Sequence, residues 1–501
     1  MTLKEIIRDC GVTDVKGSLD VEIGNVFDDS RKVKPGDLFI AVKGYGVDGH
    51  AFIGKAIGAG AAAIVYEDDS SVAPLLQNDN CHPERSEGSV TFIKVASSRH
   101  ALAIAAANFY DNPSRKLKVV GITGTNGKTT TVTLLYNLFM AQGYNCGLLS
   151  TIANYVGPHR YETANTTASP LTINSLMAEM VDAGCEYCFM EVSSIGVEQE
   201  RVAGLDFNVG IFSNLTHDHL DYHGTFAEYL RCKKLFFDNL GPEATAVINT
   251  DDKHGEVMVQ NTKAKVVTFS CRGIADHTCR VLEESFEGML LRIDGRETWT
   301  RLVGKHNASN ILAIYSAAMA LGADPEETLV AISGLEPARG RLELIKGPND
   351  LSVMIDYAHT PDALENVLKT LREIDKGKEL LCLFGCGGDR DRTKRPEMAA
   401  VAEKYSDKII VTSDNSRTEK TEDILEEIKK GFSPAGLTKA VFISDRKEAI
   451  RLAIMFAPKG AVILLAGKGH ETYQIIGTEK RHFDEREIVG EVFKSMEITD
   501  K

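Results

Sequence analysis

The stretch VVGITGTNGKTTT, residues 119–131, holds an apolar run, a glycine-rich turn and a lysine followed by threonines. A strand, such a turn and a helix start are the context in which backbone amides bind a phosphate group. Gly124 and Gly127 let these amides approach an anion without obstruction by a Cβ atom. Lys128 can neutralise phosphate charge, and the Thr129 hydroxyl can bind Mg²⁺. We therefore predict a nucleotide site, although isoleucine stands where the common fingerprint has its first glycine. The alternative is a plain turn with an exposed lysine.

The composition is that of an ordinary globular protein, with 43% hydrophobic and 26% charged residues among 501. This length predicts about two to four domains. The net charge of −14 argues against a general nucleic-acid binder, because a phosphate backbone needs a broad basic surface. No apolar run approaches the ~20 residues of a membrane span, and the first residues lack the apolar core of a signal peptide. The ten scattered cysteines, Cys185-x-x-Cys188 included, are typical of reduced structural thiols, so we expect a cytoplasmic protein.

Apolar strands alternate with helical patterns along the chain, which is typical of the α/β class. Asn112-Pro113 and the stretch GLEPARGRLELI, residues 334–345, mark two boundaries. We expect domains over residues 1–112, 113–337 and 338–501. Several strands of the last two are followed by polar loops, and ligands bind at the carboxyl ends of strands in open parallel sheets. The polar stretch of residues 77–90 predicts a loop inserted in the first domain.

Histidines and aspartates crowd the stretch SNLTHDHLDYHG, residues 213–224. A zinc hydrolase with an H-x-H-x-D-H signature is one interpretation, but the last histidine comes one residue too late for a ligand about 2 Å from zinc. The cluster can instead supply one imidazole to a second Mg²⁺ beside the nucleotide. Glu191, at the end of an apolar strand, can supply a carboxylate to the same ion. Phosphoryl transfer to an anionic acceptor needs such cations. The plain alternative is a set of loop histidines bonded to backbone.

The order of the motifs resembles that of the Mur ligases of peptidoglycan synthesis, from about residue 29 to residue 482. The motifs are GITGTNGKTT, NTTASP, MEVSS, NLTHDHLDYHG, DYAHTPD, GCGGDRD, TSDNSR and AGKGHE. The resemblance implies an N-terminal uridine-nucleotide domain, a central P-loop-type ATPase domain with a mostly parallel sheet, and a C-terminal Rossmann-like domain for an amino acid. It also implies a monomeric amide ligase that depends on ATP and Mg²⁺ and extends UDP-N-acetylmuramoyl-L-alanyl-D-glutamate through an acyl phosphate. No nucleic acid or membrane partner is expected.

The resemblance carries over a set of residues around the nucleotide. Lys233 matches a lysine that the family bears as a carbamate near the second Mg²⁺, whereas the sequence alone would place it on a helix surface. The implied catalytic residues are Lys128, Glu191, His219 and Lys233, and the implied metal ligands are Thr129, Glu191, His219 and carbamylated Lys233. The implied ATP contacts are Gly124, Thr125, Asn126, Gly127, Lys128, Thr129, Thr130, Asn307, Arg341 and Asp356.

A second set matches the site for the UDP-muramoyl dipeptide. It comprises Ser30, Tyr45, Gly46, Val47, Thr166, Thr167, Ser193, Gln199 and Arg201. Ile195 departs from the family, which usually has histidine there, so one polar contact near this substrate is in question.

The amino acid is indicated by residues 414–417, which read DNSR. Family members that accept meso-diaminopimelate carry D-N-P-R, whose arginine binds the distal carboxylate, and lysine-adding members lack the arginine. Here the arginine is kept and the proline is lost. A guanidinium forms a bidentate fork with a carboxylate and repels an ammonium group. We therefore predict diaminopimelate, with L-lysine as the alternative. The matching contacts are Arg390, Asp414, Asn415, Ser416, Arg417, Gly467 and Glu471.

Two further alternatives belong to other classes. A folylpolyglutamate synthetase shares the ATP chemistry but lacks a comparable uridine domain and the D-N-x-R loop. A nucleotide-binding scaffold without activity would leave the acidic and histidine residues without a role.

Overall fold

The computed structural model describes residues 1–44, 47–76, 90–163, 165–216 and 220–499. They form two compact units, residues 1–269 with 316–323, and residues 270–315 with 324–501. The predicted alternation of strands and helices is confirmed, and the fold class is α/β. None of the helices in the described ranges combines the length and apolar character that a bilayer crossing requires.

The first unit opens with a sheet in the order β1-β5-β4-β3-β2, in which β1 is antiparallel to β5 and the other pairs are parallel. Its side chains alternate between two apolar layers. Leu38 and Ile40 face α1 and α4, and Phe39 packs on the opposite face with Ile53 of α2. The bounds are α1 Leu3–Ile6, β1 Val12–Lys16, β2 Val26–Phe27, β3 Leu38–Ile40, α2 Ile53–Gly58, β4 Ala63–Tyr66, α3 Asp69–Leu76, β5 Thr91–Val95 and α4 Ser98–Phe109.

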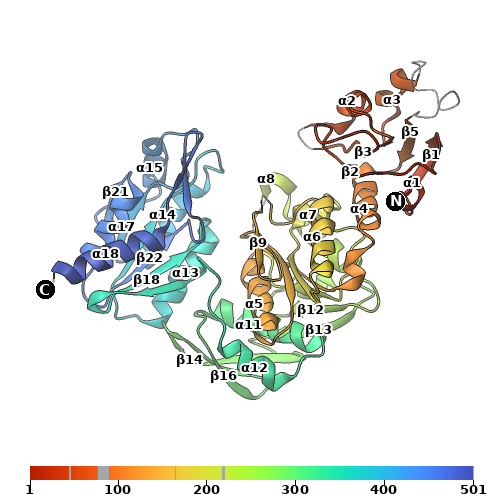
Figure 1. Cartoon of the computed structure of the whole chain (residues 1–501). Helices are drawn as coiled ribbons and strands as arrows, with labels where there is room; N and C mark the ends of the chain where they lie inside the picture. The colour runs from red at the N-terminus through yellow and green to blue at the C-terminus, as the bar shows by residue number, and fades with distance from the viewer. Residues whose placement is uncertain (45–46, 77–89, 164, 217–219, 500–501) are drawn as a thin grey trace. The chain divides into compact units, whose positions relative to one another are not determined.

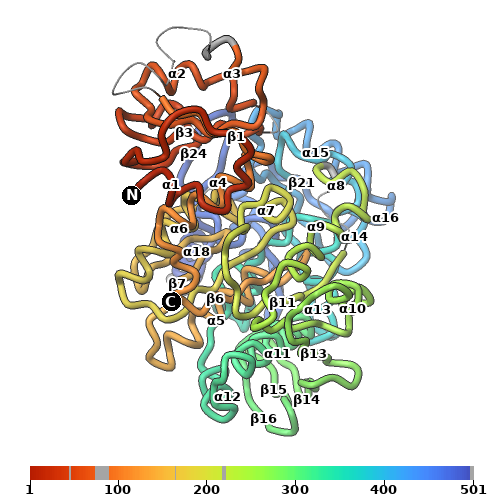
Figure 2. Tube along the Cα trace, turned by 90° about the vertical axis from the view of Figure 1, so that its right-hand side faces the viewer, coloured from red at the N-terminus to blue at the C-terminus, as the bar shows by residue number. Residues whose placement is uncertain are grey.

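A mostly parallel sheet follows, in the order β13-β12-β11-β6-β10-β7-β8-β9, to which β8 and β9 add antiparallel pairs. Helices α5 and α6 pack against β7 (Figures 1 and 2). The register pairs Ile122 of β6 with Glu191 of β10, and Thr123 of β6 with Phe212 of β11. The carboxyl ends of these three strands therefore meet at one edge, which gathers the loops that follow them.

The bounds of the elements in this part of the chain are β6 Lys118–Thr123, α5 Lys128–Ala141, β7 Cys146–Leu149, β8 Asn154–Val156, β9 His159–Tyr161, α6 Pro170–Asp182, β10 Tyr187–Glu191, α7 Ser194–Glu198, β11 Val209–Phe212, α8 Leu220–His223, α9 Phe226–Asp238, β12 Thr245–Asn249, α10 Gly255–Met258 and β13 Lys265–Ser270.

The second unit contains an antiparallel β14-β15-β16 meander and a six-stranded sheet in the order β17-β18-β22-β19-β20-β21. In the larger sheet β17 is antiparallel and the other pairs are parallel. Cys382 lies in the apolar layer under α13, α14 and α15, and Leu383 lies in the layer under α17 and α18. Figure 1 shows these helices on both faces, and the predicted Rossmann-like arrangement is confirmed.

The bounds in the second unit are β14 His277–Ser285, β15 Gly288–Ile293, β16 Arg296–Thr300, α11 Lys305–Ala320, α12 Pro325–Ser333, β17 Glu343–Lys346, β18 Ser352–Asp356, α13 Pro361–Ile374, β19 Leu380–Phe384, α14 Lys394–Tyr405, β20 Lys408–Thr412, α15 Thr421–Lys429, α16 Pro434–Leu437, β21 Ala440–Ile443, α17 Arg446–Met455, β22 Val462–Ala466, β23 Tyr473–Ile476, β24 Glu479–His482 and α18 Glu485–Thr499. Helix α11 ends in residues of the first unit.

Candidate active site

The phosphate loop joins β6 to α5 through backbone positions that favour glycine. Gly127 adopts a left-handed conformation (φ 87°) at the start of α5. Gly124 has φ 155°, and a Cβ atom there would collide with Ser213 Oγ. The segment after β11 fixes the loop, because Asn126 N donates to Asn214 Oδ1 (2.9 Å). The loop thus has the conformation in which a helix N-terminus and its amides bind an anion.

Two lysines reach the same oxygen of this loop. Lys128 Nζ donates to Gly124 O (2.9 Å) and to Thr125 O (2.8 Å). Lys233 Nζ, from α9, also donates to Gly124 O (2.7 Å), and the residue is only 1% exposed. The Tyr229 ring flanks this amine, with its centroid 4.8 Å from Nζ. Two ammonium groups on one carbonyl repel each other. A neutral or modified Lys233 amine would relieve this repulsion.

Thr125, Thr129 and Thr130, which also belong to the predicted ATP loop, lie in the loop and in the first turn of the following helix. Thr125 Oγ1 lies 3.0 Å from Tyr229 OH and accepts a hydrogen bond from Thr216 N (3.0 Å). Thr129 and Thr130 are buried in the first turn of α5. The loop is therefore tied to α9 as well as to the strand ends.

Glu191 ends β10 beside the phosphate-loop strand and is 1% exposed. Its Oε1 accepts a hydrogen bond from Thr151 N (2.8 Å), whereas no described residue hydrogen-bonds to Oε2. A buried carboxylate oxygen without a partner is costly unless a cation or a donor binds there. The residue therefore fits the predicted metal ligand.

The other proposed metal ligands are Thr129, Lys233 and His219. His219 lies outside the described residues, as do the neighbouring positions 217 and 218. Within the described ranges no group of three or more His, Cys, Asp or Glu side chains is arranged to hold a metal ion.

Three of the predicted dipeptide residues, Thr166, Thr167 and Ser193, form one cluster beside Glu191. Thr167 Oγ1 lies 3.0 Å from both Glu191 O and Ser193 Oγ, and Thr151 Oγ1 donates to Thr166 Oγ1 (3.1 Å). Ser193 Oγ also accepts from the backbone at the start of α7. These side chains follow strand ends in sequence, which is why they converge here.

Arg201 and Gln199 close the other side of this cluster. Arg201 Nη1 donates to Thr167 O (2.6 Å), and Nη2 donates to Gln199 Oε1 (2.7 Å). Burial lowers the pKa of Arg201. Gln199 Nε2 donates to Tyr222 OH (2.9 Å), a contact that the sequence did not suggest. Ser30 and Val47 lie in the β1–β5 part of the unit, the first buried and the second exposed, and Tyr45 and Gly46 lie outside the described residues.

Three predicted ATP residues belong to the second unit. Asp356, at the end of β18, accepts hydrogen bonds from Leu342 N (2.7 Å) and Ala358 N (2.8 Å), and burial raises its pKa. Leu342 has φ 47°, a strained conformation for leucine, and the adjacent Arg341 guanidinium lies 4.9 Å from the centroid of the Tyr357 ring. Asp356 and Arg341 are thus brought together through one turn.

Asn307 is the third of these residues, and its side-chain amide forms hydrogen bonds with neighbouring residues at the start of α11. Its Nδ2 donates to Val303 O (2.8 Å), and its Oδ1 accepts from Asn310 Nδ2 (3.0 Å). Its expected ATP contact therefore stays a prediction.

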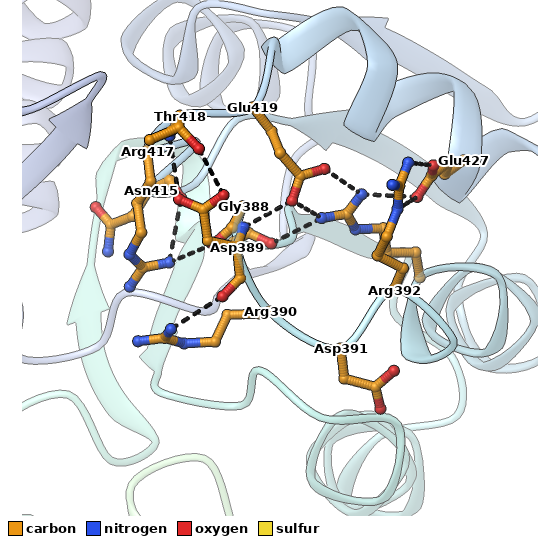
Figure 3. Close-up of polar contacts among 12 residues, drawn as sticks. Gly388, Asp389, Arg390, Asp391, Arg392, Asn415, Arg417, Thr418, Glu419 and Glu427 are labelled. Carbon is orange, nitrogen blue, oxygen red and sulfur yellow. Dashed lines mark hydrogen bonds and ion pairs between the residues drawn. The ribbon is translucent and has the colours of Figure 1, made fainter. Parts of the chain in front are cut away.

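Arg417 lies in the loop after β20 with φ 50°. Its Nη1 donates to Gly388 O (2.8 Å), in the loop after β19, and Arg390 Nη1 donates to Asp389 O (3.0 Å). Neither guanidinium forms an ion pair with a carboxylate in the described part of the chain. Figure 3 shows Arg390 and Arg417 at one end of this group, and Arg392 with Glu427 at the other. The two predicted arginines, Arg390 and Arg417, thus lie in the same group of loops. Each guanidinium donates to backbone carbonyls, and neither is paired with a carboxylate of the described residues.

The nearby carboxylates are held by other groups. Glu419 accepts from both terminal nitrogens of the buried Arg395 (2.9 and 2.8 Å), Glu427 pairs with Arg395 and Arg392, and Asp389 accepts from Thr418 Oγ1 (2.7 Å). Arg395 was not predicted, because a charged residue at a helix start usually lies on the surface.

Asp414, Asn415 and Glu471 surround a buried lysine, Lys468, which was not among the residues expected in this site. Lys468, fully buried, donates to Asn415 Oδ1 (3.1 Å), Glu471 Oε2 (3.2 Å) and Asp414 Oδ1 (3.4 Å). Burial raises the pKa of Asp414, but neighbouring cations outweigh it and lower the pKa below its usual value. Gly467 has φ 115°, and a Cβ atom added there would lie only 3.1 Å from Asp414 Oδ2. The only sequence signal for Lys468 was its place between two glycines after an apolar strand.

Ser416 and two cysteines complete the predicted positions. Ser416 is buried, and Gly388 packs so closely on its carbonyl that a side chain at 388 would collide with it. Cys185 and Cys188 are free and buried, and burial raises the pKa of both thiols, as expected for structural cysteines.

The comparisons with known proteins cover the whole chain. Three family models match: "Mur ligase family, catalytic domain" over residues 22–110, "Mur ligase middle domain" over 122–319, and "Mur ligase, glutamate ligase domain" over 340–469. A protein of Parabacteroides distasonis named UDP-N-acetylmuramoyl-L-alanyl-D-glutamate--2,6-diaminopimelate ligase is 48% identical over 99% of this chain and 100% of its own.

Solved structures agree with these matches. A structure titled as a UDP-N-acetylmuramoyl-L-alanyl-D-glutamate--2,6-diaminopimelate ligase is 30% identical, covers 99% of both chains and has a TM-score of 0.72. A Mycobacterium tuberculosis folylpolyglutamate synthase complexed with ADP shares the fold at 19% identity and a TM-score of 0.58, over 73% of this chain and 91% of its own. The fold, the phosphate loop and the full-length relatives lead to one conclusion: the chain belongs to the Mur ligase family.

Proposed function

We propose that this protein is an ATP-dependent amide ligase that adds meso-diaminopimelate to UDP-N-acetylmuramoyl-L-alanyl-D-glutamate in peptidoglycan synthesis. The observation that carries the proposal is the convergence of Lys128 and the buried Lys233 on the Gly124 carbonyl of the phosphate loop. A relative of that name, similar over its entire length, supports the same assignment. The products are the tripeptide nucleotide, ADP and phosphate.

The reaction has two steps. A carboxylate of the nucleotide substrate attacks the γ-phosphorus of ATP, which forms an acyl phosphate and releases ADP. The amine of diaminopimelate then attacks the acyl carbon, which forms the amide and expels phosphate. Lys128 stabilises negative charge on the transferred group, and the loop amides hold the phosphates in place. Catalysis of this kind consists mainly of positioning and charge neutralisation.

Thr129, Glu191, His219 and carbamylated Lys233 are the residues we assign to Mg²⁺. The buried Glu191 Oε2, which has no hydrogen-bond partner among the described residues, fits such an ion. When bound, Mg²⁺ neutralises phosphate charge and so lowers the repulsion between the substrate carboxylate and ATP. Carbamylation would turn the Lys233 ammonium into an anion, which removes its repulsion with Lys128.

The remaining assignments are part of the same proposal. The nucleotide substrate is bound by Ser30, Tyr45, Gly46, Val47, Thr166, Thr167, Ser193, Gln199 and Arg201. ATP is bound by Asn307, Arg341 and Asp356 in addition to the phosphate loop. The three domains span residues 1–112, 113–337 and 338–501. The enzyme acts as a monomer in the cytoplasm, where ATP is available.

The choice of amino acid rests on Arg417. Its guanidinium is bound only by backbone carbonyls among the described residues, so its charge is available to the distal carboxylate of diaminopimelate. L-lysine, the alternative amino acid, would place an ammonium group beside it.

Phosphate release with ATP, Mg²⁺ and UDP-N-acetylmuramoyl-L-alanyl-D-glutamate tests the proposal, with meso-diaminopimelate and L-lysine compared. Release with diaminopimelate and a product of matching mass is expected. Release with lysine alone would overturn the amino-acid assignment and keep the ligase. No release with either would overturn the tripeptide ligase, and a folate acceptor would then be assayed.

A further inference from the structure

Lys468 is bound to the diaminopimelate residues from inside the protein. Its ammonium group has three protons, and the acceptors are Asn415 Oδ1, Glu471 Oε2 and Asp414 Oδ1, at 3.1, 3.2 and 3.4 Å. All three acceptors belong to residues that the proposed function assigns to the amino acid. Because Lys468 is fully buried, its ammonium group holds the side chains of Asp414, Asn415 and Glu471 from the interior of the protein.

The surroundings keep water away from Lys468. The centroids of the Tyr473 and Phe483 rings lie 5.9 and 5.8 Å from its Nζ. Aromatic faces attract a cation, and a dry environment strengthens each of its ionic contacts. Beneath the loop, the buried Arg446 donates to Glu485 Oε1 (2.8 Å), so this second pair is neutral overall.

The charges of the site can be counted from these contacts. Asp414 and Glu471 bring two negative charges, and Lys468 cancels one of them. One negative charge remains for an ammonium group, and the guanidinium groups of Arg417 and Arg390 offer positive charge for carboxylates. An amino-acid centre carries one charge of each sign, as does the distal end of diaminopimelate. The side chain of L-lysine carries only the positive charge.

We propose that Lys468 is a positioning and specificity-determining residue. It aligns Asp414, Asn415 and Glu471 and leaves them the one negative charge that matches the single ammonium group of a zwitterionic amino-acid centre. The proposal rests on the proposed function. Without Lys468 the site would hold two uncompensated carboxylates. Such a site attracts a lone ammonium group more strongly and repels the distal carboxylate of diaminopimelate.

The test compares kcat/KM for meso-diaminopimelate and for L-lysine in the phosphate-release assay. Lys468→Gln is expected to lower the diaminopimelate-to-lysine ratio by about tenfold. The double variant Asp414→Asn/Lys468→Gln again carries one negative charge, and it is expected to return the ratio toward that of the unaltered enzyme. Arg372→Gln is the control, since Arg372 binds Tyr405 O and Asp407 in the same domain. It is expected to lower the melting temperature without changing the ratio.

A folded Lys468→Gln variant with an unchanged ratio would overturn the proposal, as would a double variant no better than the single one. If Lys468→Gln does not fold, Asp414→Asn is compared with the double variant. In Asp414→Asn the charges of Lys468 and Glu471 cancel, so no negative charge remains for an ammonium group. The further change Lys468→Gln restores one negative charge and should therefore lower the KM for diaminopimelate by about tenfold. An equal or higher KM would overturn the proposal. If the unaltered enzyme releases no phosphate with either amino acid, the proposed function fails instead.

Discussion

Lys128 and Lys233 donate to the same carbonyl oxygen, that of Gly124, although they come from different helices. Lys128 begins the helix after the phosphate loop, and Lys233 reaches the loop from α9. The arrangement places two amines where the bound ATP phosphates are proposed to lie. It is therefore the part of the site where a change of one side chain should affect turnover most.

Lys233→Met is expected to reduce turnover about 100-fold, because the proposed carbamate ligand is lost. A short carboxylate such as formate should restore part of the activity by replacing the carbamate. Phosphate release with and without formate measures both effects. Lys234→Met is the matched control, since Lys234 pairs with Asp238 at the same helix, and it should keep nearly full activity. Equal losses in the two variants would exclude a special role for Lys233.

Glu191→Gln is expected to separate activity from stability. The Oε1 contact with Thr151 N can be kept, while the charge and its unpartnered oxygen are removed. Turnover should fall about 100-fold and require more Mg²⁺. The melting temperature should stay the same or rise, because burial of a charged carboxylate whose Oε2 has no partner among the described residues destabilises the fold. Phosphate release against Mg²⁺ concentration and thermal melting give the two readouts, and a strongly lowered melting temperature with unchanged Mg²⁺ dependence would contradict the assignment.

Arg417→Gln should raise the KM for diaminopimelate about 10- to 100-fold, since a charged, bidentate partner of the distal carboxylate is lost. The KM for ATP should change little. Arg392→Gln is the control, because Arg392 lies in the same group but pairs with Glu427 (Figure 3). Steady-state kinetics with each substrate varied in turn decide the matter, and a comparable effect of both substitutions would refute the assignment.

Glu419 gives a prediction for acid stability. Its hydrogen bonds to Arg395 are the main cause that lowers its pKa from 4.5 to about 2. A carboxylate with a lowered folded-state pKa stabilises the protein above its unfolded pKa, and this contribution is lost as the pH falls from about 4.5 to about 2. Glu419→Gln should therefore cost about 1–2 kcal/mol at pH 7 and progressively less in acid.

Urea unfolding of this variant at several pH values tests the sign. Glu426→Gln serves as its control, because Glu426 pairs with Lys429 at the surface and should change stability little at any pH. A cost of Glu419→Gln that does not shrink in acid would contradict the assignment.

Much of the fold and the phosphate site followed from local sequence patterns. Apolar strands and helical periods indicated the α/β class, and the glycine spacing indicated the loop geometry at Gly124 and Gly127. These features depend on backbone conformation and on nearby residues, which a short stretch specifies. The grouping of Thr166, Thr167 and Ser193 was expected only from the resemblance to the Mur ligases, because no local pattern in the sequence links these residues.

The buried cations could not be predicted in the same way. Lys468, Arg395 and Arg446 are fully buried, although lysine and arginine usually lie at the surface. Their burial depends on carboxylates and carbonyls from distant segments, such as Glu485 for Arg446. Tyr222 is a similar case, since its contact with Gln199 joins α8 to the turn after α7. Such pairings arise from tertiary packing and leave no periodic pattern in the sequence.

The left-handed backbone of Arg417 bears on how this enzyme could evolve. A change to glycine would relax that conformation and at the same time remove the guanidinium. The relief of strain would offset part of the hydrogen bond to Gly388 O that is lost, so folding would offer little resistance to losing the residue that we propose selects the amino acid. Retention of arginine at this position would then depend mainly on natural selection for the composition of the cell wall, and a lineage released from that selection could drift toward another diamino acid at little cost in stability.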